Sequence, residues 1–190
     1  MKKILLIGGG GHCRSCIDVI EQQGVYEIAG IIDRPSELGK KILDYTIIGA
    51  DDDLPSLRNE FDYAFVTVGQ IRTADLKIKL FNLLKKLNFN IPLIVSPLAY
   101  VSKHARISQG TIVMHHALVN AGAIVGENCI INTKVLIEHD VVIEKCCHIS
   151  TGGIINGGST VKKNSFVGSN VSTNNGIEID GFNKAGVFVK

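Results

Sequence analysis

The chain has 190 residues, of which 45% are hydrophobic, and its 20 basic and 18 acidic residues leave a net charge of +2. A charge so close to balance excludes a general attraction to nucleic acid, and the sequence contains no basic cluster long enough to act as a binding arm. The length allows one or two domains, each with its own hydrophobic core.

The N-terminus and the cysteines bear on the cellular compartment. The apolar run Ile4–Ile7 holds only four residues before a series of glycines, which is too short for a signal sequence or a membrane span. Five cysteines without a secretory signal indicate reduced thiols in a cytoplasmic protein with no membrane partner. Cys13 and Cys16 match the sequence C-x-x-C, but packing on a helix is favoured over a redox role.

The first 95 residues alternate between strand and helix patterns. Strands are predicted at residues 3–7, 27–33, 47–49, 64–69 and 91–95, and longer helices at residues 13–23 and 73–87. Asp51, Asp52 and Asp53 stand at the start of a further helix, where acids cap free amides and oppose the dipole. Strands separated by helices form a parallel sheet with helices on its faces. A small Rossmann-like domain is therefore predicted over residues 1–95.

Three predicted strand ends carry residues that suit a ligand, which parallel sheets bind at the carboxyl ends of their strands. Glycines 8–11 and His12 follow the first strand, where a phosphate can approach backbone amides at a helix N-terminus. Asp33 ends the second strand and suits a ribose hydroxyl or a base edge, and Gly69 ends a later strand. Cys13 breaks the pattern G-x-G-x-x-G, so a nucleotide sugar is favoured over NAD. A plain glycine turn is the alternative.

From Pro97 to Gly168 a β-branched aliphatic residue returns at every sixth position. The twelve positions are Val101, Ile107, Val113, Val119, Val125, Ile131, Ile137, Ile143, Ile149, Ile155, Val161 and Val167. A period of six sustained over about 70 residues fits neither a helix nor an ordinary strand and indicates a solenoid. Each hexad is read as one short strand and a turn, and three hexads as one triangular coil with the aliphatic residue pointing inward. After Gly168 the pattern decays, since Thr173 replaces an aliphatic residue. A β-helix shortened at its C-terminus is therefore predicted over residues 96–190.

Because a β-helix buries its own core, chemistry must come from outward polar residues. His139 stands two positions after an inward aliphatic residue and is followed at once by Asp140. A carboxylate beside a histidine can fix its tautomer and raise its basicity. His148 and Asn132 are polar residues of the same stretch. Solvated turn residues are the alternative for each residue alone. A zinc site is disfavoured because no carboxylate–histidine–metal spacing is evident.

These features together resemble one bacterial family, which contains the sialic acid O-acetyltransferases and the nucleotide-4-amino-sugar N-acetyltransferases of glycan biosynthesis. The resemblance runs from Met1 to about Asn170 and rests on Gly11-His12, Ile32-Asp33, Val68-Gly69, Ile137-Glu138-His139-Asp140 and Cys147-His148-Ile149-Ser150. It implies that the β-helix is left-handed, which the period alone does not decide. It also implies a homotrimer with active sites between neighbouring β-helices.

The resemblance implies roles for individual residues. His139 is expected to be the general base and Asp140 to increase its basicity. The residues expected on the acetyl-CoA side are Asn132, His148, Gly157 and Ser169, and those expected to hold the nucleotide sugar are Gly10, Gly11, His12, Asp33 and Gly69. The base takes a proton from the acceptor as it attacks the thioester, and backbone amides stabilise the oxyanion. No metal is required.

The leading function is therefore acetyl-CoA-dependent N-acetylation of a nucleotide-linked amino sugar, because a nucleotide sugar needs the N-terminal domain more than a free sugar acid does. O-acetylation of sialic acid or a related sugar is the nearest alternative. A non-catalytic relative that has lost CoA binding is a second class, since the resemblance implies a further coil where this chain has residues 186–190. Metal-dependent hydratase chemistry is a third.

Overall fold

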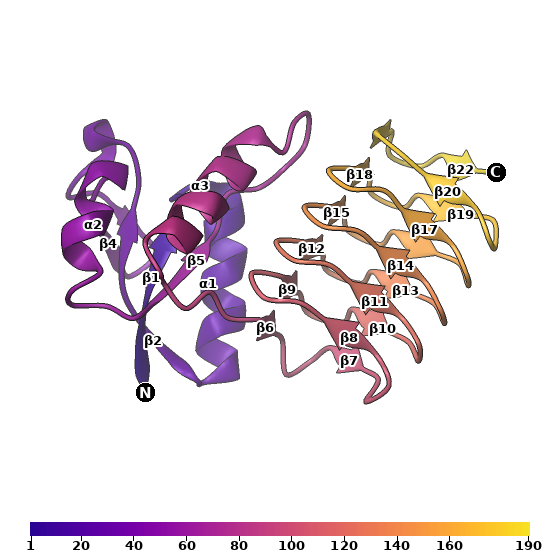
Figure 1. Ribbon diagram of the computed structural model, residues 1–190, viewed down its shortest axis with the longest axis horizontal. Helices are drawn as coiled ribbons and strands as arrows, with labels where there is room; N and C mark the ends of the chain where they lie inside the picture. Colours follow the sequence, from indigo (N-terminus) through magenta and orange to yellow (C-terminus); the bar gives the residue numbers. More distant parts are fainter. The chain divides into compact units, whose positions relative to one another are not determined.

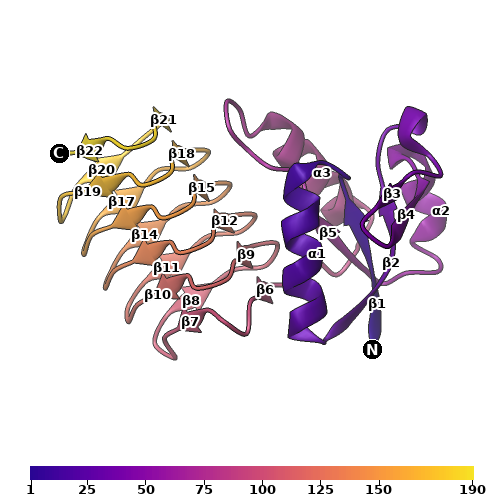
Figure 2. The same cartoon turned by 180° about the vertical axis from the view of Figure 1, so that it is seen from behind.

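In a computed structural model that describes residues 1–190, the chain divides into two compact units (Figures 1 and 2). The α/β unit comprises Met1–Gly69 and Asp75–Pro92, and the β-helix unit comprises Gln70–Ala74 and Leu93–Lys190. The segment Gln70–Ala74 thus groups with the β-helix, although it lies before the last helix of the α/β unit in the sequence.

The α/β unit is built on a five-stranded sheet in the order β3-β4-β2-β1-β5. Its strands are β1 (Lys2–Ile7), β2 (Tyr26–Ile32), β3 (Lys41–Ile42), β4 (Tyr45–Gly49) and β5 (Tyr63–Val66). All neighbours pair in parallel except β3 and β4. The fifth strand is therefore the antiparallel edge strand β3. The predicted strand at residues 91–95 is wrong as a member of this sheet, because Ile94–Val95 already follows the hexad period and joins the β-helix.

Helices α1 (Gly11–Gln23) and α3 (Asp75–Lys86) cover opposite faces of this sheet (Figures 1 and 2). The shorter helices are η1 (Pro35–Glu37), η2 (Asp51–Asp53) and α2 (Leu54–Leu57). Cys13 and Cys16 lie on the buried side of α1, and burial raises the pKa of the Cys13 thiol to about 11. A thiol so hard to ionise is packed rather than redox-active. No helix is long and apolar enough to cross a membrane.

The β-helix unit stacks two-residue strands into three parallel sheets (Figure 1). The strands are β6 (Ile94–Val95), β7 (Tyr100–Val101), β8 (Arg106–Ile107), β9 (Ile112–Val113), β10 (Leu118–Val119), β11 (Ile124–Val125), β12 (Ile130–Ile131), β13 (Leu136–Ile137), β14 (Val142–Ile143), β15 (His148–Ile149), β16 (Ile154–Ile155), β17 (Thr160–Val161), β18 (Phe166–Val167), β19 (Ser172–Thr173), β20 (Glu178–Ile179), β21 (Phe182–Asn183) and β22 (Phe188–Val189). We call β7-β10-β13-β16-β19-β22 sheet I, β8-β11-β14-β17-β20 sheet II and β6-β9-β12-β15-β18-β21 sheet III.

The hexad fixes both the core and the turns of this unit. Each of the twelve predicted aliphatic residues is the second residue of its strand, and most are fully buried in one continuous core. Every sixth residue from Gly110 to Gly176 has a left-handed backbone conformation. Seven of these twelve turn residues are not glycine: His116, Asn128, Lys134, Asp140, Cys146, Asn164 and Asn170. This regular turn position was missed in the sequence because chemically different residues occupy it.

The β-helix continues beyond Gly168 to β22, although the aliphatic pattern weakens there. Thr173 takes the inward place fully buried, and its hydroxyl accepts a hydrogen bond from the Asn156 amide at 2.9 Å. Threonine has the branched shape of valine, which explains why the coil continues. Only the last coil of the β-helix has fewer residues than the others. Val161 pairs with Ile179, a full coil later, whereas Val167 pairs with Asn183 before a full coil is complete.

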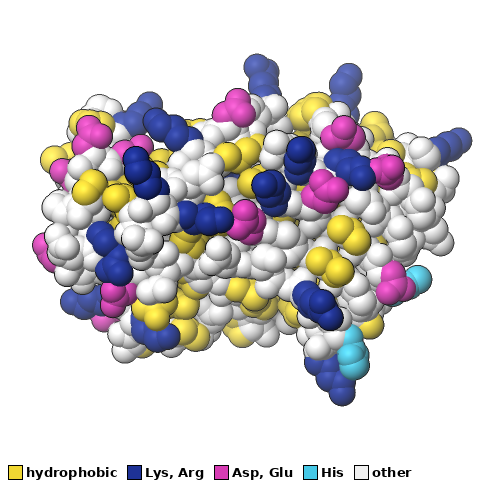
Figure 3. Space-filling view, viewed as in Figure 1, with side chains coloured by type: hydrophobic (Ala, Val, Ile, Leu, Met, Phe, Trp, Pro, Cys, Tyr) yellow, Lys and Arg dark blue, Asp and Glu magenta, His cyan; other side chains and the backbone are white.

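The surface agrees with the balanced composition. On the face shown in Figure 3, basic and acidic side chains are interspersed, and neither sign forms a continuous region. On sheet II, for example, Lys162 is paired with Glu178 and lies 3.8 Å from Glu144.

Candidate active site

His139 and Asp140 form a hydrogen-bonded dyad in the turn between β13 and β14. The Nδ1 atom of His139 lies 2.9 Å from Asp140 Oδ2. Because an ionised carboxylate can only accept a hydrogen bond, Nδ1 carries the proton of this bond, and in the neutral ring the lone pair lies on Nε2. Asp140 has a φ of 60°, a left-handed conformation that aspartate tolerates better than most residues. The turn therefore presents a histidine in the tautomer of a general base.

Two further polar residues, to which the sequence assigned no role, complete this turn. Glu138 Oε2 accepts a hydrogen bond from Asn120 Nδ2 at 2.9 Å and a weaker one from the His139 amide at 3.3 Å. Asn120 lies one coil before Glu138, at the equivalent hexad position. This spacing of one full coil is the signal that could have found the pair.

His148 and Asn132 are brought together at a different corner of the β-helix. Asn132 Nδ2 lies 3.1 Å from His148 Nε2, and His148 Nδ1 lies 2.5 Å from the carbonyl oxygen of Gln70. Since a carbonyl only accepts, Nδ1 carries the proton and Nε2 accepts from Asn132. The buried ring also packs edge-on against Phe166, with ring centroids 5.2 Å apart. His148 is thus a neutral histidine that holds the segment Gln70–Ala74.

The predicted acetyl-CoA residues divide between these two corners. Gly157 lies beside the His139 imidazole, in the turn between sheets I and II. Ser169 lies in the turn between sheets III and I, where its hydroxyl is 2.9 Å from that of Ser150, and Asn132 occupies a turn of the same column. Strand β13 runs from the Asn132 turn to the His139 turn. A single chain therefore does not bring His139 together with Asn132 and His148.

In the α/β unit, Asp33 ties the ends of two strands together. Its carboxylate accepts hydrogen bonds from the amides of Gly9, at 2.5 Å, and Arg34, at 2.6 Å. Gly10 caps α1 without a side-chain hydrogen bond, and Gly10 and Gly11 have open space where a side chain would project. The structure therefore gathers the predicted glycine loop and Asp33 at the carboxyl edge of the sheet.

Gly69 meets the glycine loop from the end of a third strand. A Cβ atom built on Gly69 would lie 3.5 Å from the Cβ of His12, which is an ordinary contact. The three strand ends that the sequence singled out thus converge, as expected for neighbouring parallel strands.

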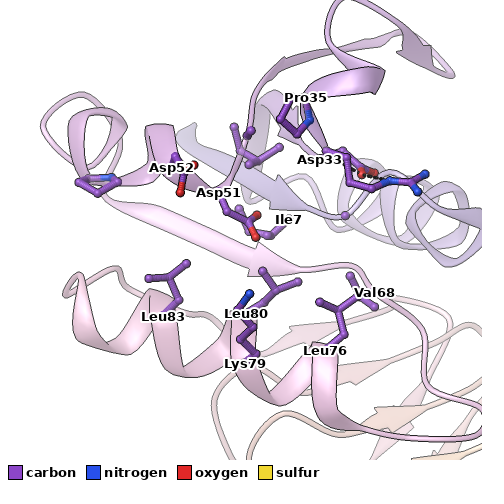
Figure 4. A pocket seen from close by; sticks show the side chains of 15 residues that line it. Ile7, Asp33, Pro35, Asp51, Asp52, Val68, Leu76, Lys79, Leu80 and Leu83 are labelled. Atoms are coloured by element: carbon purple, nitrogen blue, oxygen red, sulfur yellow. Dashed lines mark hydrogen bonds and ion pairs between the residues drawn. The ribbon is translucent and has the colours of Figure 1, made fainter.

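A pocket of about 490 Å³ opens at the same edge (Figure 4). Asp33 lines it, whereas the glycine loop from Gly10 to His12 and Gly69 do not. The α3 side chains that point into it are Leu76, Lys79, Leu80 and Leu83 (Figure 4). The sequence did not single these residues out, because their helical spacing reads as an ordinary apolar face.

Asp51 and Asp52 also line this pocket, which differs from their predicted role as helix caps. Only Asp53 makes the capping bond, in which its Oδ2 accepts from the Ala50 amide at 2.8 Å. The pKa of the Asp51 carboxyl is raised chiefly by desolvation, and the negative charges of Asp52 and Asp33 add to the rise while Lys79 opposes it.

A hexapeptide β-helix with a histidine–carboxylate dyad in one turn, together with a small α/β unit that holds a pocket, is the arrangement that the resemblance predicts for an acetyltransferase. Residues 3–76 match the PglD N-terminal domain family. The chain is 28% identical to PerB from Caulobacter crescentus, solved in complex with CoA and GDP-perosamine, with a TM-score of 0.93 over 100% of this chain and 89% of that one.

Two further solved structures are similar over nearly the whole chain. The acetyltransferase domain of PglB from Neisseria gonorrhoeae, in complex with acetyl coenzyme A, is 25% identical with a TM-score of 0.89, over 99% of this chain and 92% of that one. A mutant of perosamine N-acetyltransferase from Caulobacter crescentus, in complex with CoA and GDP-perosamine, is 25% identical with a TM-score of 0.73, over 99% and 93%. Curated protein sequences yield no significant match.

These comparisons confirm the resemblance to the acetyltransferase family and the predicted fold class, a small α/β domain followed by a left-handed β-helix. They also support the predicted enzyme class, and the similar PglB and PerB structures contain acetyl coenzyme A and CoA, respectively. No group of three or more histidine, cysteine, aspartate or glutamate side chains is placed to hold a metal ion. The roles of individual residues stay predictions.

Proposed function

We propose that this chain is an N-acetyltransferase that moves the acetyl group of acetyl-CoA to the amino group of a nucleotide-linked sugar. The observation that carries the proposal is the exposed His139 side chain, whose Nδ1 is bonded to Asp140 so that Nε2 is the base in the neutral ring. The separate pocket beside Asp33 supports a nucleotide-linked acceptor, since a free sugar acid has no use for it. Relatives that bind CoA together with GDP-perosamine support the same reading.

In the proposed mechanism, His139 acts as general base. Its Nε2 takes a proton from the sugar amine as the amine nitrogen attacks the thioester carbon. The carboxylate of Asp140 stabilises the imidazolium that forms. When the tetrahedral intermediate collapses, the carbon–sulfur bond breaks and the imidazolium returns its proton to the CoA sulfur. The products are the acetamido sugar and CoA, and no covalent enzyme intermediate is needed.

The acceptor is proposed to bind through its nucleotide portion. We assign the nucleotide portion to the pocket at the carboxyl edge of the sheet and to the loop formed by Gly10, Gly11 and His12, with Gly69 beside it. Open space at Gly10 and Gly11, next to the N-terminus of the 13-residue helix α1, suits a phosphate. Asn132, His148, Gly157 and Ser169 remain the residues proposed for acetyl-CoA.

We further propose that the active unit is a homotrimer, in which the His139 corner of one copy faces the Asn132 corner of the next. The dyad supports this, because its side chains are 63% and 71% exposed and a general base works best with water excluded. The outward row of sheet I supports it as well. Leu118, Leu136 and Ile154 form an apolar row there, which the exposed Tyr100 extends at one end, while Ser172 separates it from the exposed Phe188 at the other.

We also propose that this reaction belongs to bacterial glycan biosynthesis in the cytoplasm, which the resemblance and the five free cysteines support. The test is release of CoA thiol from acetyl-CoA across a panel of nucleotide amino sugars, with sialic acid as the hydroxyl acceptor. We expect turnover with at least one amine acceptor and none with sialic acid. Turnover with sialic acid alone would establish O-acetylation instead, and the absence of both turnover and acetyl-CoA binding would refute the enzyme.

The shared site can be tested by mixing inactive variants. His139→Ala and Asn132→Ala subunits, unfolded together and refolded at equal concentration, should recover about a quarter of the wild-type activity. That fraction follows because a site between two copies needs an intact His139 from one and an intact Asn132 from its neighbour. No recovery from refolded, trimeric mixtures would place both residues in a site within one chain.

A further inference from the structure

Two glycines bracket the dyad from the neighbouring coils. Gly122 lies one coil before Asp140 and Gly157 lies one coil after His139, in the adjacent rungs of the stack. The other left-handed residues in the column of turns that contains Asp140 are all glycines, namely Gly122, Gly158 and Gly176. Asp140 is therefore the only residue with a side chain among the left-handed turn residues of this column.

The Asp140 carboxylate lies over Gly122. A Cβ atom built on Gly122 would stand well inside van der Waals contact of Asp140 Oδ1 and 3.2 Å from its Cγ. The other oxygen of the same carboxylate, Oδ2, is the partner of His139 Nδ1. Any side chain at position 122 would therefore push the carboxylate away from the place where it bonds the imidazole. Gly176 is a glycine of the same column without such a contact, since a Cβ atom built on it would meet nothing within 4 Å.

The His139 ring lies over Gly157 in the same manner. A Cβ atom built there would stand 2.6 Å from Nε2 and 2.7 Å from Cε1, well inside van der Waals contact. Gly157 does not have a left-handed φ, so its backbone does not require glycine. The imidazole alone accounts for the missing side chain, and the atom that it protects is the nitrogen that accepts the proton.

We propose that Gly122 and Gly157 are positioning residues for the dyad. Gly122 gives the Asp140 carboxylate the space from which it orients the imidazole, and Gly157 gives the imidazole the space that keeps Nε2 accessible. The proposal rests on His139 being the base of the proposed function. Gly157 thus leaves space for the imidazole in addition to its expected place beside acetyl-CoA. Gly122 leaves space for the Asp140 carboxylate in addition to forming its own left-handed turn.

The first test compares Gly122→Ala with Gly176→Ala. Both replacements put alanine at a left-handed turn of the same column, with φ of +78° and +66°, so the backbone strain is matched. We expect kcat to fall about 100-fold in Gly122→Ala, because small displacements of a catalytic group have effects of that size, with KM for acetyl-CoA unchanged. Gly176→Ala should keep wild-type kcat. Equal losses in the two variants would overturn the role of Gly122.

A double mutant separates positioning from a general structural effect. Asp140→Gly removes the carboxylate and places in the turn the residue that the other left-handed turns of the column use. If Gly122 acts through Asp140, then adding Gly122→Ala to Asp140→Gly should lower kcat no further. A structural role predicts the same loss in both backgrounds. The corresponding test for Gly157 uses His139→Ala, in which the ring is gone and adding Gly157→Ala should lower kcat no further. A further loss there would overturn the role of Gly157.

A measurement that needs no substrate keeps this proposal separate from the proposed function. Nitrogen chemical shifts of the histidine rings report the tautomer, and the His139 signal is identified by its loss in His139→Ala. We expect wild type and Gly176→Ala to show the Nδ1-protonated form, and Gly122→Ala to show a mixture. An unchanged tautomer in Gly122→Ala would overturn the positioning role. The expected change without turnover on any amino sugar would instead refute the function and leave the positioning role intact.

Discussion

In the β-helix, every side chain occupies a place on a repeating grid, whereas the pocket of the α/β unit is lined by segments that share no period. His139 stands two residues after the inward Ile137, and the glycines that bracket the dyad lie one coil to either side. The pocket takes Asp33 from the end of β2, Asp51 from η2 and four residues from α3. In the β-helix, the stacking of coils fixes the position of each side chain. In the α/β pocket, side-chain positions depend on tertiary packing between segments that have no common repeat.

The difference teaches where each unit tolerates change. A β-helix coil touches only its neighbours, so a change in one rung acts locally and leaves distant coils in place. The α/β pocket has an exposed helix face on one side, since Leu76 is 53% exposed, and a carboxylate with a raised pKa on the other. We expect catalytic geometry to depend on the grid and ligand affinity to depend on the pocket.

Replacement of His139 by alanine is the largest expected effect. Loss of a positioned general base should lower kcat by about 10²- to 10⁴-fold while the fold persists, because an exposed side chain contributes little to stability. Thiol release and thermal unfolding measure the two quantities. The matched control is His104→Ala, an exposed turn histidine of the same β-helix. Activity retained in His139→Ala would show that His139 is not the general base.

Replacement of an inward residue tests the grid itself. Ile155 is fully buried in the β-helix core, and its truncation to alanine should cost about 2 to 5 kcal/mol of unfolding free energy. Ile124→Ala is the control, since this outward isoleucine is 45% exposed and should change stability by less than about 0.5 kcal/mol. Hydrogen exchange should show the loss in the coils around β16 and leave the amides of β1 and β2 protected. Equal loosening of both units would contradict local stacking.

Much of the β-helix could be predicted because β-branched aliphatic residues recur at every sixth position of the sequence. The inward aliphatic residues and the outward His139 and Asp140 follow from counting, and Asn120 could have been found by the same spacing. Counting aliphatic residues missed the inward place of Thr173, which fits by shape while its hydroxyl is satisfied by Asn156. Hydropathy alone does not reveal a buried threonine with a hydrogen-bond partner.

The α/β site was predicted less completely. The strand ends at Asp33 and Gly69 follow from the general rule for parallel sheets. Asp51 and Lys79 do not, because an acid before a helix reads as a cap and a lysine on a helix reads as solvated. In the β-helix unit, the contact between His148 and Gln70 joins residues that lie far apart in the sequence. No local pattern predicts a bond of that range.

Alkaline conditions should weaken the α/β unit through Cys13. Burial holds this thiol protonated, with its pKa raised from 9.0 to about 11. A raised pKa in the folded state means that the stabilisation is complete below pH 9 and is lost as the pH rises through 11. The free energy of unfolding should fall by about 2 kcal/mol over that range. Urea unfolding at both pH values measures the fall, and Cys13→Ala should show a correspondingly smaller one. An identical fall in Cys13→Ala would assign the loss to other groups.

Lys79 gives the smallest of these effects and bears most directly on the pocket. It lines the pocket together with the carboxylates of Asp33, Asp51 and Asp52. Its replacement by alanine removes a positive charge and makes the electrostatic potential of the pocket more negative. A nucleotide phosphate should then bind more weakly, and KM for the nucleotide sugar should rise about tenfold while kcat and KM for acetyl-CoA stay unchanged, because the interaction is the same in the ground and transition states. Lys86→Ala, on the same helix but outside the pocket, is the control. A fall in kcat instead would mean that the pocket, like the grid, sets the geometry of the reaction.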